Sequence, residues 1–573
     1  MKARYPAKRL LLIGVDGATL DLINLWIDDL PNFAQLLKGG AWGRLESTPD
    51  QNSAASWSSI VTGKNPGKHG IFWFVEYKEG SYDYRYINAS YRDGKTLWRL
   101  LSEAGKRVGA INVPISYPAE EVNGFVISGI DCPGIEDPRF TYPPELSEEI
   151  RKEVGEYIIE PGIPSFVTAG RLEEGVTRLH QTVAQRLAVT KYLMRARPWE
   201  FFMVVFTSPD SAQHFYWKYM EPEGFEVSPK EVEKYQDTIR NVYRQVDQAL
   251  GELLALAGED CNVLVVSDHG GTAATGRSRF LARWLEAIGV LKYKERGALD
   301  SLQGKAKQLC FDTLAWGYRQ IDKRFGREFK LRLARLFPRL RERIEIHISY
   351  GEIDWPATKA YTDARRPNIW INLRGRQPQG IVEPGEEYER VRDYIIERLM
   401  AARDSRTGLP LVEAVLRREE AYHGRHVPKA PDLVIQWMEK AHLDRADLGE
   451  ETSGVLGEER KRTILFRGPV TISGGHAKYG VIFMRGPGVK QGVEITGAKV
   501  TDVAPTVLYL MGESIPEDMD GRVLNEAFEE ELLLHHPIRR VSLEEGEAGE
   551  RAVYSDEDAQ TIGDRLRGLG YVE

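Results

Sequence analysis

Three short apolar segments each lead into an aspartate. The segments read LLLIGV, FFMVVF and NVLVVS, and the acids that follow them are Asp16, Asp210 and Asp268. Apolar runs of this length between turn signals are typical of buried strands in a parallel sheet. In open α/β sheets, ligands bind beyond the carboxyl ends of the strands. Three carboxylates gathered there would repel one another at neutral pH, so the pattern predicts metal cations between them.

Three histidines strengthen this prediction. His214 follows Asp210 by four residues in PDSAQH, which puts both side chains on one face of a helical turn. His269 comes directly after Asp268, and the two glycines that follow permit a turn there. His476 ends the segment SGGH, where two more glycines allow close approach of the main chain. Mixed carboxylate and imidazole ligands suit zinc, with manganese or iron as alternatives.

Each of these patterns alone has an ordinary explanation as a turn, a helix cap or a surface histidine. Their joint appearance, with the aspartates at expected strand ends, favours a metal centre.

A serine-rich segment, SAASWSSIVTGKNPGKHG, supplies a candidate nucleophile. Trp57, Ile60 and Val61 have helical spacing, so a helix is expected to begin near Ser53. A helix N-terminus favours a phosphate, and a serine beside a metal can lose its proton and attack phosphorus. Simple capping also explains a serine there. The spacing leaves four rival hydroxyls, those of Ser56, Ser58, Ser59 and Thr62. The segment lacks the G-x-x-x-x-G-K-[ST] order of nucleotide triphosphatases.

The elements that must position these residues alternate between strands and helices. Further strands are expected at 108–113, 125–128, 368–373, 433–437 and 480–484, and helices at 20–37 and 239–254. This alternation predicts an α/β fold, a doubly wound, mainly parallel sheet flanked by helices, with helical cap insertions.

Composition and charge exclude several classes of protein. The chain has 573 residues, of which 42% are hydrophobic and 28% charged, which is typical of a globular protein. The net charge, 77 − 85 = −8, argues against a general polyanion binder, and no nucleic-acid polymer is expected as a partner. Three scattered cysteines provide neither a disulfide framework nor a thiolate zinc site. The first apolar run is too short for a signal peptide or membrane span, so a cytoplasmic location is expected.

The expected domains are a discontinuous core, 1–290 and 350–525, a basic insertion, 291–349, and an acidic linker with a final helix, 526–573. Residues 305–345 hold 12 Lys or Arg and 5 Asp or Glu, a net charge of +7. A helical insertion with a solvated basic face is the simplest interpretation. The alternatives are a substrate cap that attracts anions and a surface that makes peripheral contact with anionic lipid.

These motifs together resemble the alkaline phosphatase superfamily. Within it, the chain is most similar to the type I phosphodiesterase/nucleotide pyrophosphatase branch and its phosphohydrolase/phosphomutase-like relatives. The resemblance covers most of the chain and runs through LLIGVDG, SWSSIVTGKNPGKHGIF, TSPDSAQH, VVSDHGG and SGGHAKYGVIFMRGPGVK.

The resemblance implies a site with two divalent metal ions. One ion would be held by Asp16, Ser53, Asp268 and His269, with Ser53 as both ligand and nucleophile. The other would be held by Asp210, His214 and His476. Relatives often have Thr-Pro-Pro-Ala-Trp at the nucleophile, where this chain reads SAASW, and many nucleotide-cleaving relatives have Asn at the position of Ser56. Weaker candidates for substrate contacts are Lys64, Lys68 and Asn112.

The implied activity is hydrolysis of a small phosphoester through a phosphoseryl intermediate, as in phosphodiesterases and nucleotide pyrophosphatases. A phosphomutase or a phosphomonoesterase would use the same site, and a non-catalytic, metal-stabilised binding module is a further alternative. The sulfatase signature C/S-x-P-x-R is missing at Ser53, which disfavours an arylsulfatase.

Overall fold

The computed structural model describes residues 8–223, 225–274, 277–294, 353–363, 366–404, 408–439, 446–447, 472–542 and 551–569. Nearly all of the expected basic insertion, 291–349, lies outside the described residues. Its helices, and its roles as a cap or a lipid-contacting surface, therefore stay predictions.

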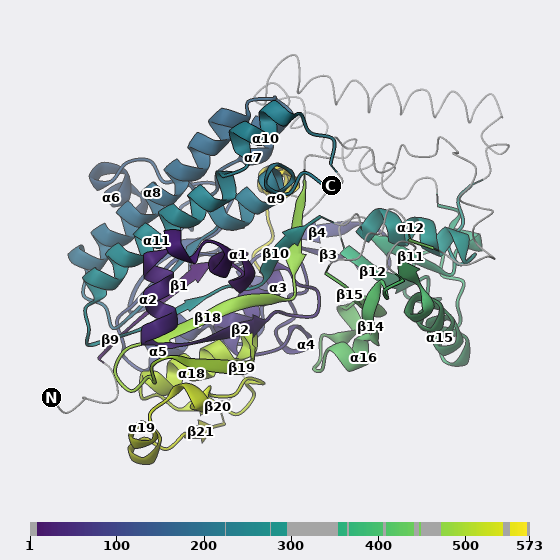
Figure 1. Ribbon diagram of the computed structural model, residues 1–573. Helices are drawn as coiled ribbons and strands as arrows, with labels where there is room; N and C mark the ends of the chain where they lie inside the picture. The colour runs from purple at the N-terminus through teal and green to yellow at the C-terminus, as the bar shows by residue number, and fades with distance from the viewer. Residues whose placement is uncertain are drawn as a thin grey trace.

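A nine-stranded sheet forms the centre of the protein (Figure 1), in the order β19-β2-β18-β9-β1-β8-β5-β6-β7. Only β18 and β7 run opposite to the other strands of this sheet. The expected α/β class, with a mainly parallel sheet, is therefore confirmed. The strands are β1 (Arg9–Val15), β2 (Ala41–Glu46), β5 (Val108–Val113), β6 (Gly124–Ser128), β7 (Thr141–Tyr142), β8 (Phe201–Phe206), β9 (Cys261–Val266), β18 (Tyr479–Arg485) and β19 (Val493–Lys499).

Helices cover both faces of this sheet, as a strand that is apolar on both sides requires. Along β1, Leu11, Ile13 and Val15 face one apolar cluster, whereas Leu10 and Leu12 face the other, because successive side chains alternate across a strand. The first cluster includes residues of α2 (Pro31–Gly39), α8 (Leu172–Ala196), α9 (Ser208–Met220) and α11 (Thr238–Ala257). The second includes residues of α3 (Ser53–Thr62), α5 (Leu97–Glu103) and α18 (Val503–Leu510).

The helix expected at 20–37 is wrong as a single element. The structure has α1 (Leu20–Leu25), the 3-10 turn η1 (Ile27–Asp29) and then α2, which begins at Pro31. Proline has no main-chain N–H and cannot continue a preceding helix, but it suits the first position of a new one. The amphipathic helix expected at 239–254 is confirmed as α11.

A second sheet lies beside the first (Figure 1) and has its own apolar core. It is antiparallel, in the order β11-β12-β15-β14. The strands expected at 368–373 and 433–437 are present, but they belong to this sheet rather than to the central one. We call this part the second unit; its elements are α12 (Arg277–Ala287), β11 (Ala360–Asp363), β12 (Arg366–Ile371), α15 (Glu386–Ala401), β14 (Val412–Arg417) and β15 (Leu433–Trp437).

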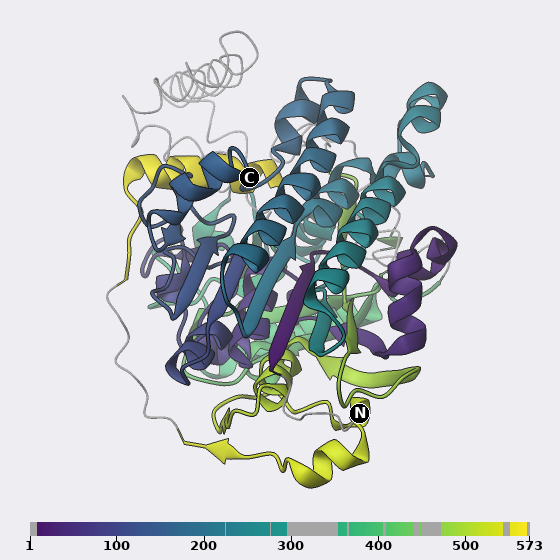
Figure 2. The same cartoon turned by 90° about the vertical axis from the view of Figure 1, so that its left-hand side faces the viewer.

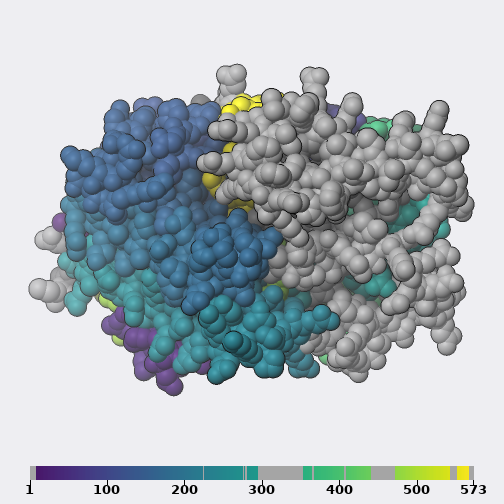
Figure 3. Space-filling view, turned by 90° about the horizontal axis from the view of Figure 1, so that it is seen from above, coloured from purple at the N-terminus to yellow at the C-terminus, as the bar shows by residue number. Residues whose placement is uncertain are grey.

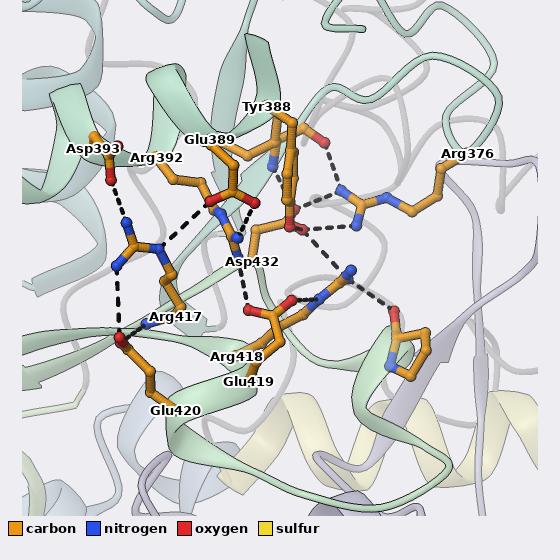
Figure 4. Close-up of polar contacts among 12 residues, drawn as sticks. Arg376, Tyr388, Glu389, Arg392, Asp393, Arg417, Arg418, Glu419, Glu420 and Asp432 are labelled. Carbon is orange, nitrogen blue, oxygen red and sulfur yellow. Dashed lines mark hydrogen bonds and ion pairs between the residues drawn. The ribbon is translucent and has the colours of Figure 1, made fainter. Parts of the chain in front are cut away.

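The buried carboxylate of Asp432 connects several segments of the second unit by hydrogen bonds and an ion pair (Figure 4). It accepts hydrogen bonds from both terminal nitrogens of Arg376, at 2.8 and 2.5 Å, and from the Tyr388 hydroxyl at 2.6 Å. It also accepts the Ile371 main-chain N–H at 2.7 Å and pairs with Arg418 at 3.4 Å. Because these donors come from separate segments, the carboxylate holds strand, helix and loop in one arrangement.

The last described helix, α20 (Asp556–Leu569), lies at the upper left in Figure 2, and in Figure 3 its atoms adjoin the blue helical layer. Its residues Ile562 and Leu566 pack in an apolar cluster that includes Ala54, directly after Ser53. Arg565 anchors it by donating Nη1–H to the Ile130 carbonyl at 2.8 Å. A helix is thus present where the final helix was expected, and it shares an apolar cluster with the residue that follows Ser53.

The remaining described elements are short. They are α4 (Pro66–His69), α6 (Leu146–Glu153), α7 (Ile163–Thr168), α10 (Pro229–Tyr235), α16 (Arg418–Ala421), α19 (Glu530–His535), β3 (Val75–Tyr77), β4 (Tyr84–Tyr86), β13 (Arg403–Asp404), β16 (Ala446–Asp447), β20 (Ile515–Pro516), β21 (Arg540–Val541), and the 3-10 turns at 89–91, 355–357, 427–429, 500–502 and 525–527. Among the described helices, none combines the length and the apolar character that crossing a bilayer requires.

Candidate metal centre

Three adjacent central strands place the three aspartates. In the sheet, β1 lies between β9 and β8, and the three strands run parallel. Asp16 directly follows β1, Asp268 lies two residues after β9, and Asp210 lies in the first turn of α9, just after β8. Their carboxyl ends therefore meet at one edge of the sheet, as expected for an open α/β fold.

The histidines reach the same edge by two different routes. His214 lies one helical turn after Asp210 in α9, and its Nε2 is 3.3 Å from Asp210 Oδ2. His476 lies on β17 (Gly474–Ala477), which pairs antiparallel with β10 (Gly270–Ala273), directly after His269. His476 Nε2 is 3.6 Å from Asp210 Oδ1, and its ring stacks on His269 with ring centroids 3.7 Å apart.

The six Asp and His side chains form two overlapping groups. In one, ligand atoms of Asp16, Asp268 and His269 all lie within 4.8 Å of one another. In the other, the same holds for Asp210, His269 and His476. His214 lies with the second group, because its Nε2 is 3.0 Å from His476 Nε2.

Main-chain carbonyls orient all three imidazoles in the same way. Nδ1 of His214 lies 3.0 Å from the Gly474 carbonyl, Nδ1 of His269 lies 3.0 Å from the Gly270 carbonyl, and Nδ1 of His476 lies 2.6 Å from the Gln51 carbonyl. A carbonyl can only accept, so each Nδ1 carries a proton, and in the neutral imidazole each Nε2 then presents a lone pair. Three lone pairs thus point into a cluster of carboxylates, an arrangement that a divalent cation stabilises.

The carboxylates are desolvated and short of donors. Asp16 Oδ1 and both carboxylate oxygens of Asp268 are buried and receive no hydrogen bond from the described part of the chain. Burial, together with the charges of Asp268 and Asp210, raises the pKa of Asp16 well above its usual range. Burial likewise raises the pKa of Asp268. Carboxylates normally avoid such surroundings unless they coordinate a metal, so the residues present fit a cation here.

The second group differs in its electrostatics. Burial would raise the pKa of Asp210, but His214, His476 and His269 together hold it below its ordinary value. Burial would lower the pKa of His214, but the Asp210 carboxylate raises it. Burial and the neighbouring His269 lower the pKa of His476 well below the usual histidine range. A neutral imidazole is the form that binds a metal.

Ser53 is the first residue of α3 and is completely buried. Its Oγ lies 3.1 Å from His269 Nε2. The helix is capped by Asn52, whose side chain accepts the Ala55 main-chain N–H at 3.0 Å. Ser53 therefore does not cap the helix. Its hydroxyl lies next to the metal-binding side chains and at the positive end of the helix dipole.

Three of the four rival hydroxyls have other partners. Ser56 Oγ lies 2.9 Å from both Ser47 Oγ and Thr48 Oγ1. Ser59 Oγ lies 3.0 Å from His69 Nε2, and Thr62 donates to the Ser58 carbonyl at 2.7 Å. Ser58 is completely buried, and its Oγ has no hydrogen-bond partner in the described part of the chain. None of these residues shows a contact with the six Asp and His side chains in the described structure, so Ser53 is the hydroxyl that the fold brings to them.

The three weaker candidates show no hydrogen bond or ion pair to the six Asp and His side chains in the described structure. Lys64 and Lys68 follow the far end of α3 and pair with Asp518 and Asp520. At a rise of 1.5 Å per residue, this ten-residue helix separates them from Ser53 by roughly 15 Å. Asn112 is fully buried at the end of β5 and donates to the Val205 carbonyl at 3.1 Å. Substrate contacts by these residues stay predictions.

Several supporting residues have no recognisable sequence signal. Trp57 donates its indole N–H to Asp16 Oδ2 at 3.0 Å. Ser47 donates to the Asp268 carbonyl at 2.6 Å, and Gln51 supplies the carbonyl that orients His476. A main-chain carbonyl is present at every residue, so only the folded chain reveals which ones act.

A buried histidine outside this centre gives a pH-dependent prediction. His69 is fully buried; its Nδ1 accepts the Ile71 N–H at 3.1 Å, so Nε2 carries the proton. Burial, with Arg92 and His426 nearby, lowers the pKa of His69 to about 3, whereas an unfolded histidine titrates near 6.5. Below that pH the unfolded chain binds a proton that the folded chain does not, so stability falls as the pH drops.

We expect His69→Gln to remove this component, about 1.4 kcal/mol per pH unit between pH 6.5 and the folded pKa. Urea unfolding gives the free energy of unfolding of each protein at pH 7.5 and pH 4.5. The loss between the two pH values should be larger in wild type than in His69→Gln. An equal loss of stability in both proteins would show that His69 is not its source.

Known proteins resemble the chain at the level of the family. The family model for type I phosphodiesterase/nucleotide pyrophosphatase matches residues 10–459. No curated protein matches the sequence. Among solved structures, the chain is similar to an inactive form of murine ectonucleotide pyrophosphatase/phosphodiesterase 5 in complex with AMP, at 12% identity and a TM-score of 0.44, over 88% of this chain and 96% of that one.

Two further solved structures are similar. The human ectonucleotide pyrophosphatase/phosphodiesterase 5 is 12% identical, with a TM-score of 0.43, over 90% of this chain and 97% of that one. Phosphonoacetate hydrolase from Sinorhizobium meliloti, in complex with phosphonoformate, is 14% identical, with a TM-score of 0.45, over 88% of this chain and 95% of that one. Because the family model covers well over half of the chain, the protein belongs to the type I phosphodiesterase/nucleotide pyrophosphatase family of the alkaline phosphatase superfamily.

Proposed function

We propose that the protein is a metal-dependent hydrolase of phosphoric esters, of the phosphodiesterase type, with Ser53 as its nucleophile. The observation that carries the proposal is the convergence of three imidazole Nε2 atoms and three buried carboxylates next to a serine hydroxyl at a helix N-terminus. The family is one of phosphoester hydrolases, which agrees with this reading.

Each residue has a defined place in the proposed site. Asp16, Asp268, His269 and Ser53 would hold one divalent cation, and Asp210, His214 and His476 the second. Zinc suits this mixture of imidazole and carboxylate, with manganese or iron as alternatives. Such cations lower the pKa of a bound hydroxyl and offset the charge on phosphoryl oxygens.

The reaction at Ser53 is an in-line displacement. The Ser53 hydroxyl releases its proton to solvent as Oγ forms a bond to phosphorus. The bond from phosphorus to the leaving oxygen breaks, and the leaving group departs as an oxyanion or takes a proton from solvent. The first turn of a helix has main-chain N–H groups without intrahelical partners, and that of Ser53, at the start of α3, would donate to the transferred group. Water then cleaves the phosphoseryl ester and restores the hydroxyl.

A pair of substrates tests the ester class. We expect metal-loaded protein to release p-nitrophenolate from bis(p-nitrophenyl) phosphate with a kcat/KM at least about tenfold higher than from p-nitrophenyl phosphate, because the family cleaves diesters. The reverse preference would favour the phosphomonoesterase alternative.

Product analysis separates the remaining alternatives. Isomerised sugar phosphate without free phosphate or alcohol would identify a phosphomutase. Stoichiometric metal with no turnover of any phosphoester would identify a binding module and contradict the proposal.

A further inference from the structure

The guanidinium of Arg277 is a shielded cation next to the metal centre. Its Nη1 donates to the main-chain carbonyl of His476 at 3.4 Å. Its Nε and Nη2 are buried, yet neither meets an acceptor within the described part of the chain. Burial lowers the pKa of Arg277 to about 10, partly offset by the charge of Glu439, so the group is positively charged at neutral pH.

Arg277 lies where the second unit joins the metal centre. It is the first residue of α12, whose apolar residues pack in the core of the second unit. The preceding strand, β10, pairs with the strand that carries His476. The positive end of the α12 dipole therefore lies at the same place as the guanidinium.

This side of the centre is also its more accessible side. The side chain of His476 is 13% exposed, whereas those of Asp268 and His269 are fully buried. A ligand that approaches from solvent therefore reaches the His476 side first, and Arg277 contacts the main chain of that residue.

Buried arginine N–H groups that have no acceptor indicate a site for a ligand. A guanidinium loses strong hydration on burial, and unmet donors in a native structure mark the place of a water, an ion or a substrate group. The planar fork of arginine matches two oxygens of a phosphate or carboxylate. An oxyanion would offset the positive charge of Arg277 and accept hydrogen bonds from its Nε and Nη2.

We propose that Arg277 binds an oxyanion of the substrate other than the phosphoryl group that Ser53 attacks. In the described part of the chain, the hydrogen bond of Arg277 goes to the His476 main chain, and no hydrogen bond or ion pair joins its guanidinium to Ser53 or to the six Asp and His side chains. The preferred substrates are then phosphoric diesters or anhydrides that carry an additional phosphate or carboxylate. This inference rests on the proposed function and specifies its substrate class.

Two matched diesters test it. Propyl p-nitrophenyl phosphate and 2-carboxyethyl p-nitrophenyl phosphate share a leaving group and differ in a terminal carboxylate. We expect the wild-type protein to prefer the carboxylate. Arg277→Gln should lower the ratio of the two kcat/KM values about 10- to 100-fold, the usual effect of losing hydrogen bonds to a charged group. Arg277→Lys should restore part of the ratio, because it keeps the charge but loses the fork.

Arg283 provides the control, because it is an exposed arginine on the same helix. Arg283→Gln removes the same charge and should leave the ratio at its wild-type value. An equal fall of both kcat/KM values in Arg277→Gln would overturn the proposal, since Arg277 would then act on the attacked phosphoryl group or on folding. An unchanged ratio would also overturn it.

A binding measurement separates this inference from the proposed function. Calorimetry of metal-loaded protein should show that Arg277→Gln weakens pyrophosphate binding about 10- to 100-fold and weakens phosphate binding much less. If the wild-type protein cleaves neither diester, the proposed function fails, and this measurement still decides the role of Arg277. Equal losses for phosphate and pyrophosphate would contradict it.

Discussion

Ser53→Ala is expected to lower kcat by at least about 10³-fold while metal binding persists. The hydroxyl is completely buried at the start of α3, 3.1 Å from His269 Nε2, and Asn52 rather than Ser53 caps the helix. The variant therefore loses the nucleophile but keeps the helix and the six Asp and His side chains. The release of p-nitrophenolate measures kcat. Mass spectrometry measures the metal content separately.

Ser56→Ala is the matched control, because Ser56 is a buried serine of the same helix whose hydroxyl contacts Ser47 and Thr48. We expect it to change kcat by less than about tenfold. Wild-type protein that is acid-quenched during turnover of bis(p-nitrophenyl) phosphate should carry on Ser53 a phosphoryl group that keeps its second p-nitrophenyl ester. Wild-type turnover in Ser53→Ala, or phosphate on Ser56, would show that the nucleophile has been assigned wrongly.

Asp268→Asn is expected to have opposite effects on stability and activity. In chelator-treated protein, burial raises the pKa of Asp268, and the charge of Asp210 raises it further, although the neighbouring His269 lowers it. An amide of the same shape removes that like-charge repulsion, so the free energy of unfolding of the chelated variant should exceed that of chelated wild type by about 1–3 kcal/mol. The variant should therefore unfold at a higher temperature. In metal-loaded protein the same change should lower kcat at least about 10³-fold, a trade of function for stability.

Asp247→Asn controls for replacing a buried aspartate. Asp247 is also buried, but it accepts hydrogen bonds from the Asn32 and Phe33 main-chain N–H groups at 3.0 and 2.8 Å. Its substitution should destabilise the chelated and the metal-loaded protein equally. Thermal unfolding of all three proteins, with and without zinc or manganese, provides the comparison. Chelated Asp268→Asn that unfolds below chelated wild type would refute the electrostatic argument.

Local patterns in the sequence predicted most of the central elements. Runs such as FFMVVF are apolar at every position because strands in the middle of a parallel sheet are covered on both faces. The amphipathic helix α11 was equally readable, because its apolar residues recur every three to four positions. The break at Pro31 was missed, because the apolar pattern continues across it while the backbone cannot.

The second unit shows the limit of such patterns. Strands β12 and β15 were recognisable as strands, but they pair with each other rather than with the central sheet. Apolar periodicity predicts that a residue is buried, but it does not indicate the sheet to which its strand belongs. Strand partners are set by contacts between distant segments.

The sequence by itself determined which side chains can hold metal and attack phosphorus, because Asp, His and Ser are chemically capable wherever they lie and their strand-end positions are readable. Only the tertiary structure decided three further points. It showed that Asn52 rather than Ser53 caps α3, that carbonyls of Gly474, Gly270 and Gln51 turn every Nε2 inward, and that Arg277 lies beside His476. The contacts of His214, His476 and Arg277 join residues 260, 425 and 199 positions apart. The Asn52 cap and the Gly270 carbonyl are local, but main-chain groups are identical at every position until the chain folds.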